Sequence, residues 1–192
     1  MANILVLYAT REGQTKKIAT RIAIGMRARG HEVALINAED EREDLPVTRL
    51  DAVCIGAPVH FGRYPRAIAR FVRTHRTLLQ STPSSFFSVC MAIAHGTAEG
   101  RAEAQKYVDR LSRQTGWTPG HVELFAGAVP YTKYGFFTRW MMQKIARKTG
   151  GDADASRDYE YTNWDQVDRF TASVANAAFA RTTAAAHQHA AE

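Results

Sequence analysis

Several features that mark common protein classes are missing from this chain of 192 residues. Acidic residues are in the minority, 19 against 25 lysines and arginines, which gives a net charge of +6. No run of about 20 apolar residues occurs, so we expect no membrane-spanning helix. No signal-peptide core precedes the first strand pattern. These absences predict a protein that is made and kept in the cytoplasm.

Cysteine is also scarce, and nucleic-acid motifs are absent. Cys54 and Cys90 lie in the apolar runs DAVCIG and FSVCMA without a CxxC pair, so we expect buried thiols and no metal site. Aromatic and basic residues do not interleave along strands as an RNA-binding sheet requires. The positive charge therefore points to an anionic membrane surface or an acidic small molecule, with solubility alone as a third interpretation.

Apolar strand patterns alternate with amphipathic helix patterns along the chain. We expect strands at Asn3 to Ala9, His31 to Asn37, Asp51 to Gly56, Ser85 to Met91 and Val122 to Val129. Helices are expected at Thr15 to Arg29, Pro65 to Leu79, Ala98 to Gln114 and Asn163 to Ala180, the last capped by Thr162. This alternation predicts an α/β, flavodoxin-like, doubly wound sheet of five parallel strands in the order 2-1-3-4-5. We expect one domain over residues 1–181, with a long insertion at about 130–161 and a disordered tail at 182–192.

The loop after the first strand pattern is rich in hydroxyl and amide groups. It lacks the GxxxxGK[ST] and GxGxxG patterns but fits the T-x-x-G-x-T phosphate loop of flavodoxins. Backbone N–H groups and the positive end of a helix dipole favour an anion at such a place. The predicted phosphate-binding residues are Thr10, Arg11, Glu12, Gly13, Gln14 and Thr15. A plain helix cap at Gln14 or Thr15 is the alternative interpretation.

Two further loops are expected beside the first one, since ligands of such sheets bind beyond the carboxyl ends of the strands. Glycines allow close approach to a flat ring, and Phe61 and Tyr64 offer faces for stacking. The predicted ring-side residues are Ala57, Pro58, Val59, His60, Phe61, Gly62 and Tyr64 after the third strand, and Ala92, Ile93, Ala94 and His95 after the fourth. Alternatively, Phe61 and Tyr64 cover the core.

The insertion combines aromatic and basic residues and contains no acidic residue between Leu124 and Gly151. An apolar group is followed by a basic one, which fits either a bilayer interface with anionic headgroups or a large flat substrate with carboxylates. A third interpretation is packing on the sheet edge. The residues proposed to contact substrate or membrane are Lys133, Phe136, Phe137, Arg139, Trp140, Lys144, Arg147 and Lys148.

Four segments together resemble the menaquinone-dependent protoporphyrinogen IX dehydrogenase family: ATREGQT, IGAPVHFGRYP, AGAVPYTKY with RWMMQKIARKTGG, and YTNWDQV. The resemblance implies an FMN enzyme of haem synthesis. Such an enzyme oxidises protoporphyrinogen IX and passes electrons to a membrane quinone while peripherally associated with the inner face of the membrane. By the same resemblance, residues 10–15 hold the FMN phosphate, and residues 56–64 and 92–95 flank the ring.

The sequence singles out no catalytic side chain, because no hydrolase or metalloprotease motif occurs. His60 and Arg63 are candidates by position only. Two alternative functions stay open. One is a reductase of quinones or tetrapyrroles that uses NAD(P)H. The other is a flavodoxin electron carrier, against which the net charge of +6 argues.

Overall fold

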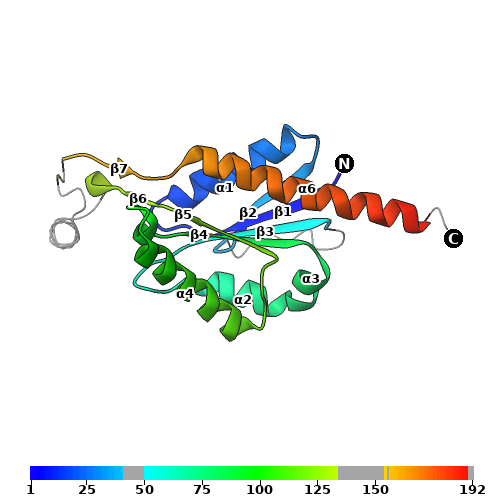
Figure 1. Ribbon diagram of the computed structural model, residues 1–192, viewed down its shortest axis with the longest axis horizontal. Helices are drawn as coiled ribbons and strands as arrows, with labels where there is room; N and C mark the ends of the chain where they lie inside the picture. The colour runs from blue at the N-terminus through cyan, green and yellow to red at the C-terminus, as the bar shows by residue number, and fades with distance from the viewer. Residues whose placement is uncertain (41–49, 134–153, 155, 190–192) are drawn as a thin grey trace.

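A twisted sheet of five parallel strands forms the centre of the molecule (Figure 1). The computed structural model describes residues 1–40, 50–133, 154 and 156–189. The strands are β1 (Asn3–Tyr8), β2 (Glu32–Asn37), β3 (Ala52–Pro58), β4 (Ser84–Val89) and β5 (His121–Phe125). Their order is β2-β1-β3-β4-β5, and every neighbouring pair is parallel. The predicted fold class and strand order are confirmed.

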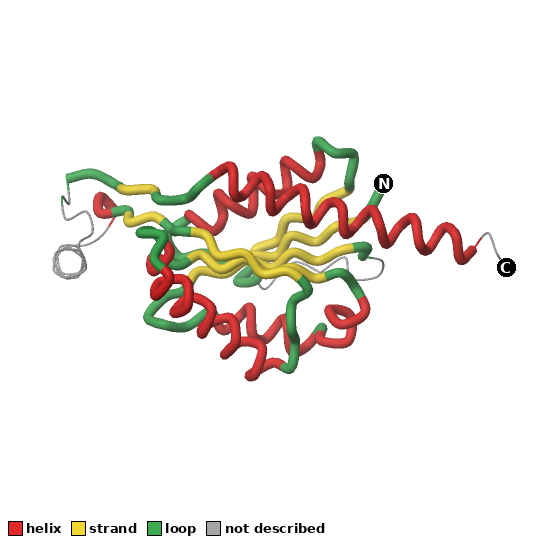
Figure 2. Tube along the Cα trace, viewed as in Figure 1, coloured by secondary structure: helices red, strands yellow, loops and turns green. Residues whose placement is uncertain are grey.

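Helices cover both faces of this sheet (Figures 1 and 2). One layer consists of α1 (Gln14–Arg27) and α6 (Trp164–His189). The other consists of α2 (Arg66–Thr74), α3 (Arg76–Ser81) and α4 (Ala98–Thr115). Short 3-10 turns, η1 (Met91–Ile93) and η2 (Tyr131–Lys133), follow β4 and the small strand β6 (Ala128–Val129), respectively. Among the described residues, no helix combines the length and hydrophobicity of a membrane span.

Each face of the sheet has its own apolar core. Phe87, Phe125 and Phe170 meet between the sheet and the α1–α6 layer, with ring centroids 5.7–6.1 Å apart. On the other face, Trp117 packs edge-on to Phe86, and its Nε1 donates a hydrogen bond of 3.0 Å to Ser84 Oγ. Central strands with two buried faces explain the continuous apolar runs in the sequence.

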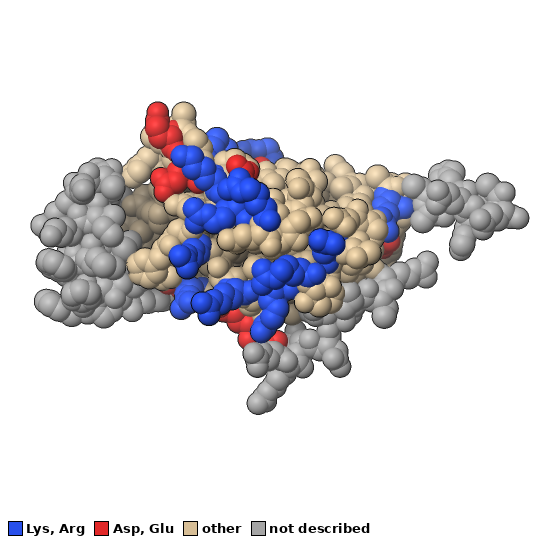
Figure 3. Space-filling model, turned by 90° about the horizontal axis from the view of Figure 1, so that it is seen from below, with Lys and Arg blue, Asp and Glu red and all other residues tan. Residues whose placement is uncertain are grey.

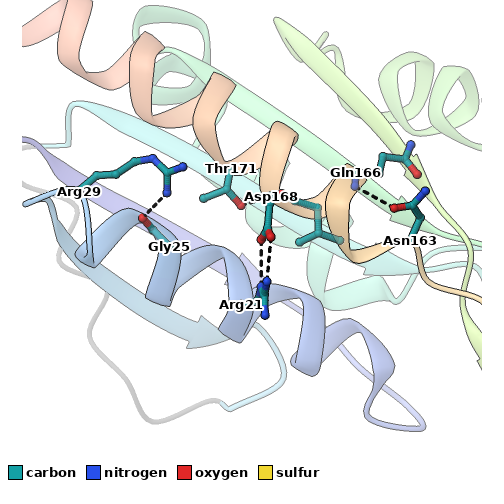
Figure 4. A network of polar contacts seen from close by, with 8 residues as sticks. Arg21, Gly25, Arg29, Asn163, Gln166, Asp168 and Thr171 are labelled. Atoms are coloured by element: carbon teal, nitrogen blue, oxygen red, sulfur yellow. Dashed lines mark hydrogen bonds and ion pairs between the residues drawn. The ribbon is translucent and has the colours of Figure 1, made fainter.

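The two helices of the first layer lie close together at Gly25. A Cβ at this position would come within 3.0 Å of Thr171 Cγ2 on α6 (Figure 4). Arg21 and Asp168 join the same two helices through paired hydrogen bonds of 2.9 and 2.8 Å. The contact therefore combines close backbone approach with an ion pair at the surface.

Several predicted boundaries are wrong. The helix expected from Pro65 to Leu79 is interrupted at His75, which lies between α2 and α3 and has non-helical backbone angles. The fifth strand ends at Phe125, and β6 instead forms an antiparallel pair with β7 (Tyr159–Glu160).

The last helix differs from the prediction at both ends. It extends to His189 rather than ending near Ala180. Asn163, not Thr162, caps it, because Asn163 Oδ1 accepts from Gln166 N at 3.1 Å (Figure 4). An amide side chain in this position satisfies one of the first free N–H groups of a helix.

Candidate functional site

The three loops singled out by the sequence follow β1, β3 and β4, and these strands are successive neighbours in the sheet. Because all three strands are parallel, the loops lie at the same edge, where α1 and α4 also begin (Figure 1). The strand order reverses direction between β1 and β3, which is the place where ligands bind in open α/β sheets. The topology therefore brings the predicted residues of the three loops to one edge.

The first loop turns sharply into α1. Thr10 Oγ1 accepts from Gly13 N at 3.1 Å, and Gly13 has a φ of 96°, which favours glycine. In the described part of the chain, no side chain caps α1, and the first turn of this helix contains no acidic residue. The N–H groups at the start of α1 are thus not bonded to a capping side chain, and with the helix dipole they favour an anion. The alternative of a cap by Gln14 or Thr15 is not what the structure has.

The start of α1 is tied to the distant segment before α6. Gln14 Nε2 donates to Thr162 Oγ1 at 2.9 Å, and Thr162 Oγ1 donates to Ala126 O at 2.8 Å, with both side chains buried. Sequence reasoning missed this link, because Gln14 and Thr162 are 148 positions apart. The loop is therefore held by three separate parts of the chain.

An ion pair beside this link joins α1 to β7. Lys17 Nζ lies 2.8 Å from Glu160 Oε2, and Trp164 Nε1 donates to Glu160 Oε1 at 2.9 Å. Partial burial acts to raise the pKa of Glu160, but hydrogen bonds from Lys17, Trp164 and Gln14 outweigh it, so the pKa lies below its ordinary value. A hollow of about 100 Å³ separates the loop from β6 and β7, lined in part by Glu12, Gln14 and Tyr159.

The second loop contains a tight hairpin. His60 N donates to Arg63 O at 2.9 Å and Arg63 N to His60 O at 3.1 Å, so Phe61 and Gly62 occupy the turn. Both have positive φ, 46° and 71°, as in the tight turns of β-hairpins. The Phe61 side chain is 81% exposed and packs edge-on against His60. The hairpin thus holds an aromatic ring at the surface in a backbone conformation that costs a non-glycine residue energy.

Tyr64 has a different environment from the rest of this loop. Its ring packs edge-on against Phe86 with centroids 5.2 Å apart, and its hydroxyl donates to Ser88 Oγ at 2.9 Å. Burial raises the pKa of Tyr64, although the bond to Ser88 opposes this. The structure places Tyr64 against the core of the α2–α4 side, which agrees with the interpretation of a core cover rather than an open stacking face.

The third loop is compact and packs against the start of α4. Ala94 N donates to Met91 O and Gly96 N to Ile93 O, both at 3.0 Å. A Cβ at Gly100 would lie 2.0 Å from Ala92 O, so only glycine permits this approach of helix and loop. Sequence reasoning missed Gly100, although a glycine in the first turn of a helix is a signal of close packing.

The basic and aromatic residues predicted to contact substrate or membrane lie outside the described part of the chain. They are Phe136, Phe137, Arg139, Trp140, Lys144, Arg147 and Lys148. Lys133 ends η2, but its side chain is likewise outside the description. The structure brings the residues of the three loops together at one edge of the sheet. The predicted role of the insertion residues stays a prediction.

A family model described as a flavodoxin domain matches residues 5–156, so the chain belongs to the flavodoxin family, which implies a flavin cofactor. Two solved structures agree with this fold. A short-chain flavodoxin associated with a bacterial microcompartment has a TM-score of 0.52 at 14% identity and covers 93% of this chain and 99% of its own. A flavodoxin, WrbA-like protein from Agrobacterium tumefaciens has a TM-score of 0.51 at 14% identity and covers 94% of this chain and 99% of its own.

Curated relatives narrow the assignment. Protoporphyrinogen IX dehydrogenase [quinone] of Escherichia coli K12 is 31% identical over 172 residues, which is 90% of this chain and 94% of the relative. The protein of the same name from Leishmania major is 31% identical over 171 residues, 89% of this chain and 74% of its own length. Within the flavodoxin family, this chain therefore belongs with the quinone-linked protoporphyrinogen IX dehydrogenases.

Proposed function

We propose that this chain oxidises protoporphyrinogen IX to protoporphyrin IX with FMN as cofactor and a membrane quinone as electron acceptor. The observation that carries the proposal is 31% identity, over 90% of the chain, to a protoporphyrinogen IX dehydrogenase [quinone]. The reaction removes six electrons and six protons from the porphyrinogen, and three quinone molecules take them up as three quinols. A bound flavin supplies the two-electron chemistry of each step, and the protein supplies position and environment.

The residues present fit a flavin mononucleotide at the carboxyl edge of the sheet. The start of α1 offers backbone N–H groups that no side chain caps, which suits a phosphate. We propose that Thr10, Arg11, Glu12, Gly13, Gln14 and Thr15 hold this phosphate. The Gln14–Thr162 link would keep the loop in one conformation, because both groups are buried and paired.

For the ring, we propose the two following loops: Ala57, Pro58, Val59, His60, Phe61, Gly62 and Tyr64, together with Ala92, Ile93, Ala94 and His95. Phe61 is the exposed aromatic side chain among them, and Tyr64 would support the hairpin from below through Phe86 and Ser88. We assign no acid–base residue, because a bound flavin would supply the redox chemistry and His60 and Arg63 are candidates by position only.

We further propose that the enzyme works at the inner face of the membrane, on whose anionic surface the insertion would act. Support comes from the quinone named in the relatives and from the sequence of residues 133–148, which is basic and aromatic without acidic residues. Cations near an anionic bilayer and aromatic side chains at its interface both favour binding.

The deciding experiment is anaerobic. The purified FMN-loaded protein is mixed with protoporphyrinogen IX, a quinone is then added, and flavin absorbance and porphyrin fluorescence are followed. We expect bleaching of the flavin, then reoxidation as fluorescence rises. A flavin that stays oxidised with porphyrinogen but is bleached by NAD(P)H would overturn the proposal in favour of a reductase.

A further inference from the structure

A basic groove runs between α2 and α4, on the opposite side of the sheet from α6. Its volume is about 870 Å³. Its basic residues, which define what we call the arginine groove, are Arg63, Arg66, Arg70, Arg73 and Arg110. Seen from this side, Lys and Arg atoms gather over the face with few Asp or Glu atoms among them (Figure 3). Among the described residues that line the groove, none is acidic.

The helical pattern of α2 arranges these side chains in a row. Arg66, Arg70 and Arg73 are spaced by four and three residues, so they share one exposed face over about 10 Å, while Ile68 and Phe71 are buried on the other. From Ala52 to Ala98 the chain contains no Asp or Glu at all. The positive charge of this stretch is therefore not offset by carboxylates of its own segment.

Within the residues that the structure describes, these guanidinium groups have few partners. Arg110 Nη1 donates to Gly62 O at 3.1 Å, and its guanidinium lies 5.8 Å from the centre of the Tyr107 ring. Among the ion pairs of the described residues, none includes an arginine of the groove. Like charges one turn apart on a helix repel one another. This repulsion destabilises the unbound protein, and an anionic partner would offset it.

We propose that the arginine groove is a docking surface for the phosphate headgroups of an anionic lipid bilayer. Guanidinium groups match phosphate oxygens in geometry as well as charge. The groove begins at Gly62 and Arg63, in the hairpin that also carries the exposed Phe61, so docking brings the candidate flavin edge to the bilayer. The choice of lipid over another polyanion rests on the proposed function, whose electron acceptor is dissolved in the membrane.

The test compares two variants that each lose two positive charges. In one, Arg70→Gln and Arg73→Gln remove two arginines of the groove that lie away from the flavin loops. In the control, Arg27→Gln and Arg169→Gln remove exposed arginines of the α1–α6 layer. Binding of the FMN-loaded full chain is measured by flotation with vesicles of phosphatidylcholine alone or with 30 mol% (about one third) phosphatidylglycerol. Each cation close to an anionic surface strengthens binding about fivefold, so we expect the groove variant to bind roughly 25-fold more weakly than the control.

Three outcomes would overturn the proposal: equal loss in both variants, equal binding of wild type to neutral and anionic vesicles, or binding to duplex DNA that depends on Arg70 and Arg73 without binding to vesicles. Turnover with a short-chain, water-soluble quinone does not require membrane binding. It therefore tests the proposed function separately from the docking surface. The groove variant should retain that rate while losing vesicle binding. A wild-type protein that binds anionic vesicles through the groove but does not oxidise porphyrinogen would refute the function and leave the docking surface standing.

Discussion

The two helical layers that cover the sheet carry their charges in different ways. In the α1–α6 layer, Arg21 is paired with Asp168 (Figure 4). Lys17 of the same layer is paired with Glu160 of β7, so positive charge joins one element to another. In the α2–α4 layer, the arginines line a groove without acidic residues (Figure 3). Charge serves cohesion in the first layer, whereas in the second it remains available to a ligand.

In the α1–α6 layer, we expect the buried apolar contacts to contribute more to the free energy of unfolding than the surface ion pairs do. Phe170 on α6 packs against Phe87, Phe125 and His121 and is almost fully buried. We expect Phe170→Ala to lower the free energy of unfolding by about 3–5 kcal/mol, measured by denaturant titration. Phe179→Ala, on the same helix but 57% exposed, is the control and should change it by less than about 0.5 kcal/mol. The expectation would be contradicted if Phe170→Ala lowered the free energy of unfolding by less than removal of the Arg21–Asp168 pair does.

The buried link between Gln14 and Thr162 sets the candidate phosphate loop apart from other contacts of the same layer. Thr162→Val removes one acceptor of Gln14 Nε2 and the hydroxyl that donates to Ala126 O, so we expect a loss of about 1–3 kcal/mol in stability and weaker FMN binding. Thr171→Val removes another buried hydroxyl, which donates to Val167 O within α6. If a fluorescence titration gives the same FMN affinity for both variants, the Gln14–Thr162 hydrogen bond does not hold the loop in its binding conformation.

A double-mutant cycle at Arg21 and Asp168 sharpens the contrast further. Both side chains are about half exposed, so solvent screens the pair, and we expect a small coupling energy that decreases further in high salt. Thermal unfolding of wild type, Arg21→Gln, Asp168→Asn and the double variant gives the value. A coupling that salt leaves unchanged would show that the pair is shielded from solvent.

The smallest expected effect concerns His75, at the break between α2 and α3. Burial lowers its pKa, so the unfolded chain binds the proton more readily than the folded one. Stability should therefore fall as the pH drops below the ordinary histidine pKa of about 6.5, and it should be unaffected by this group at higher pH. Thermal unfolding at pH 7.5 and 5.5 (about one pH unit on either side of that value) checks this, and His75→Gln should reduce the difference. His31, whose pKa is lowered first by burial and then by nearby positive charge, adds to the same trend.

The sheet and its strand order could be predicted because each buried strand has a local pattern of apolar residues. The run ILVL indicates a buried strand, and the glycine after α1 indicates a helix end, without knowledge of any distant contact. For the same reason the three loops at the carboxyl edge could be placed in advance. Parallel strands with short crossovers leave few alternatives for where their ends meet.

Features that depend on distant partners could not be predicted. The pairing of β6 with β7 joins Val129 to Tyr159, and the apolar pattern up to Val129 looked like one continuous strand. The arginine groove needs α2 to lie beside α4, so Arg110 reaches Gly62 across 48 positions of sequence. The helical pattern of the sequence continues on both sides of His75, so the break is seen only in the backbone angles of this residue.

The hydrogen bond from Gln14 to Thr162 has a consequence for the order of events during synthesis. The loop that begins α1 is made early, but its partner is added 148 residues later. At translation rates of about 5–20 residues per second, the delay is roughly 7–30 seconds. Until then the nascent loop lacks the contact that fixes Gln14. We therefore expect the candidate phosphate loop to reach its final conformation late in synthesis, only after the segment around residue 162 has been made.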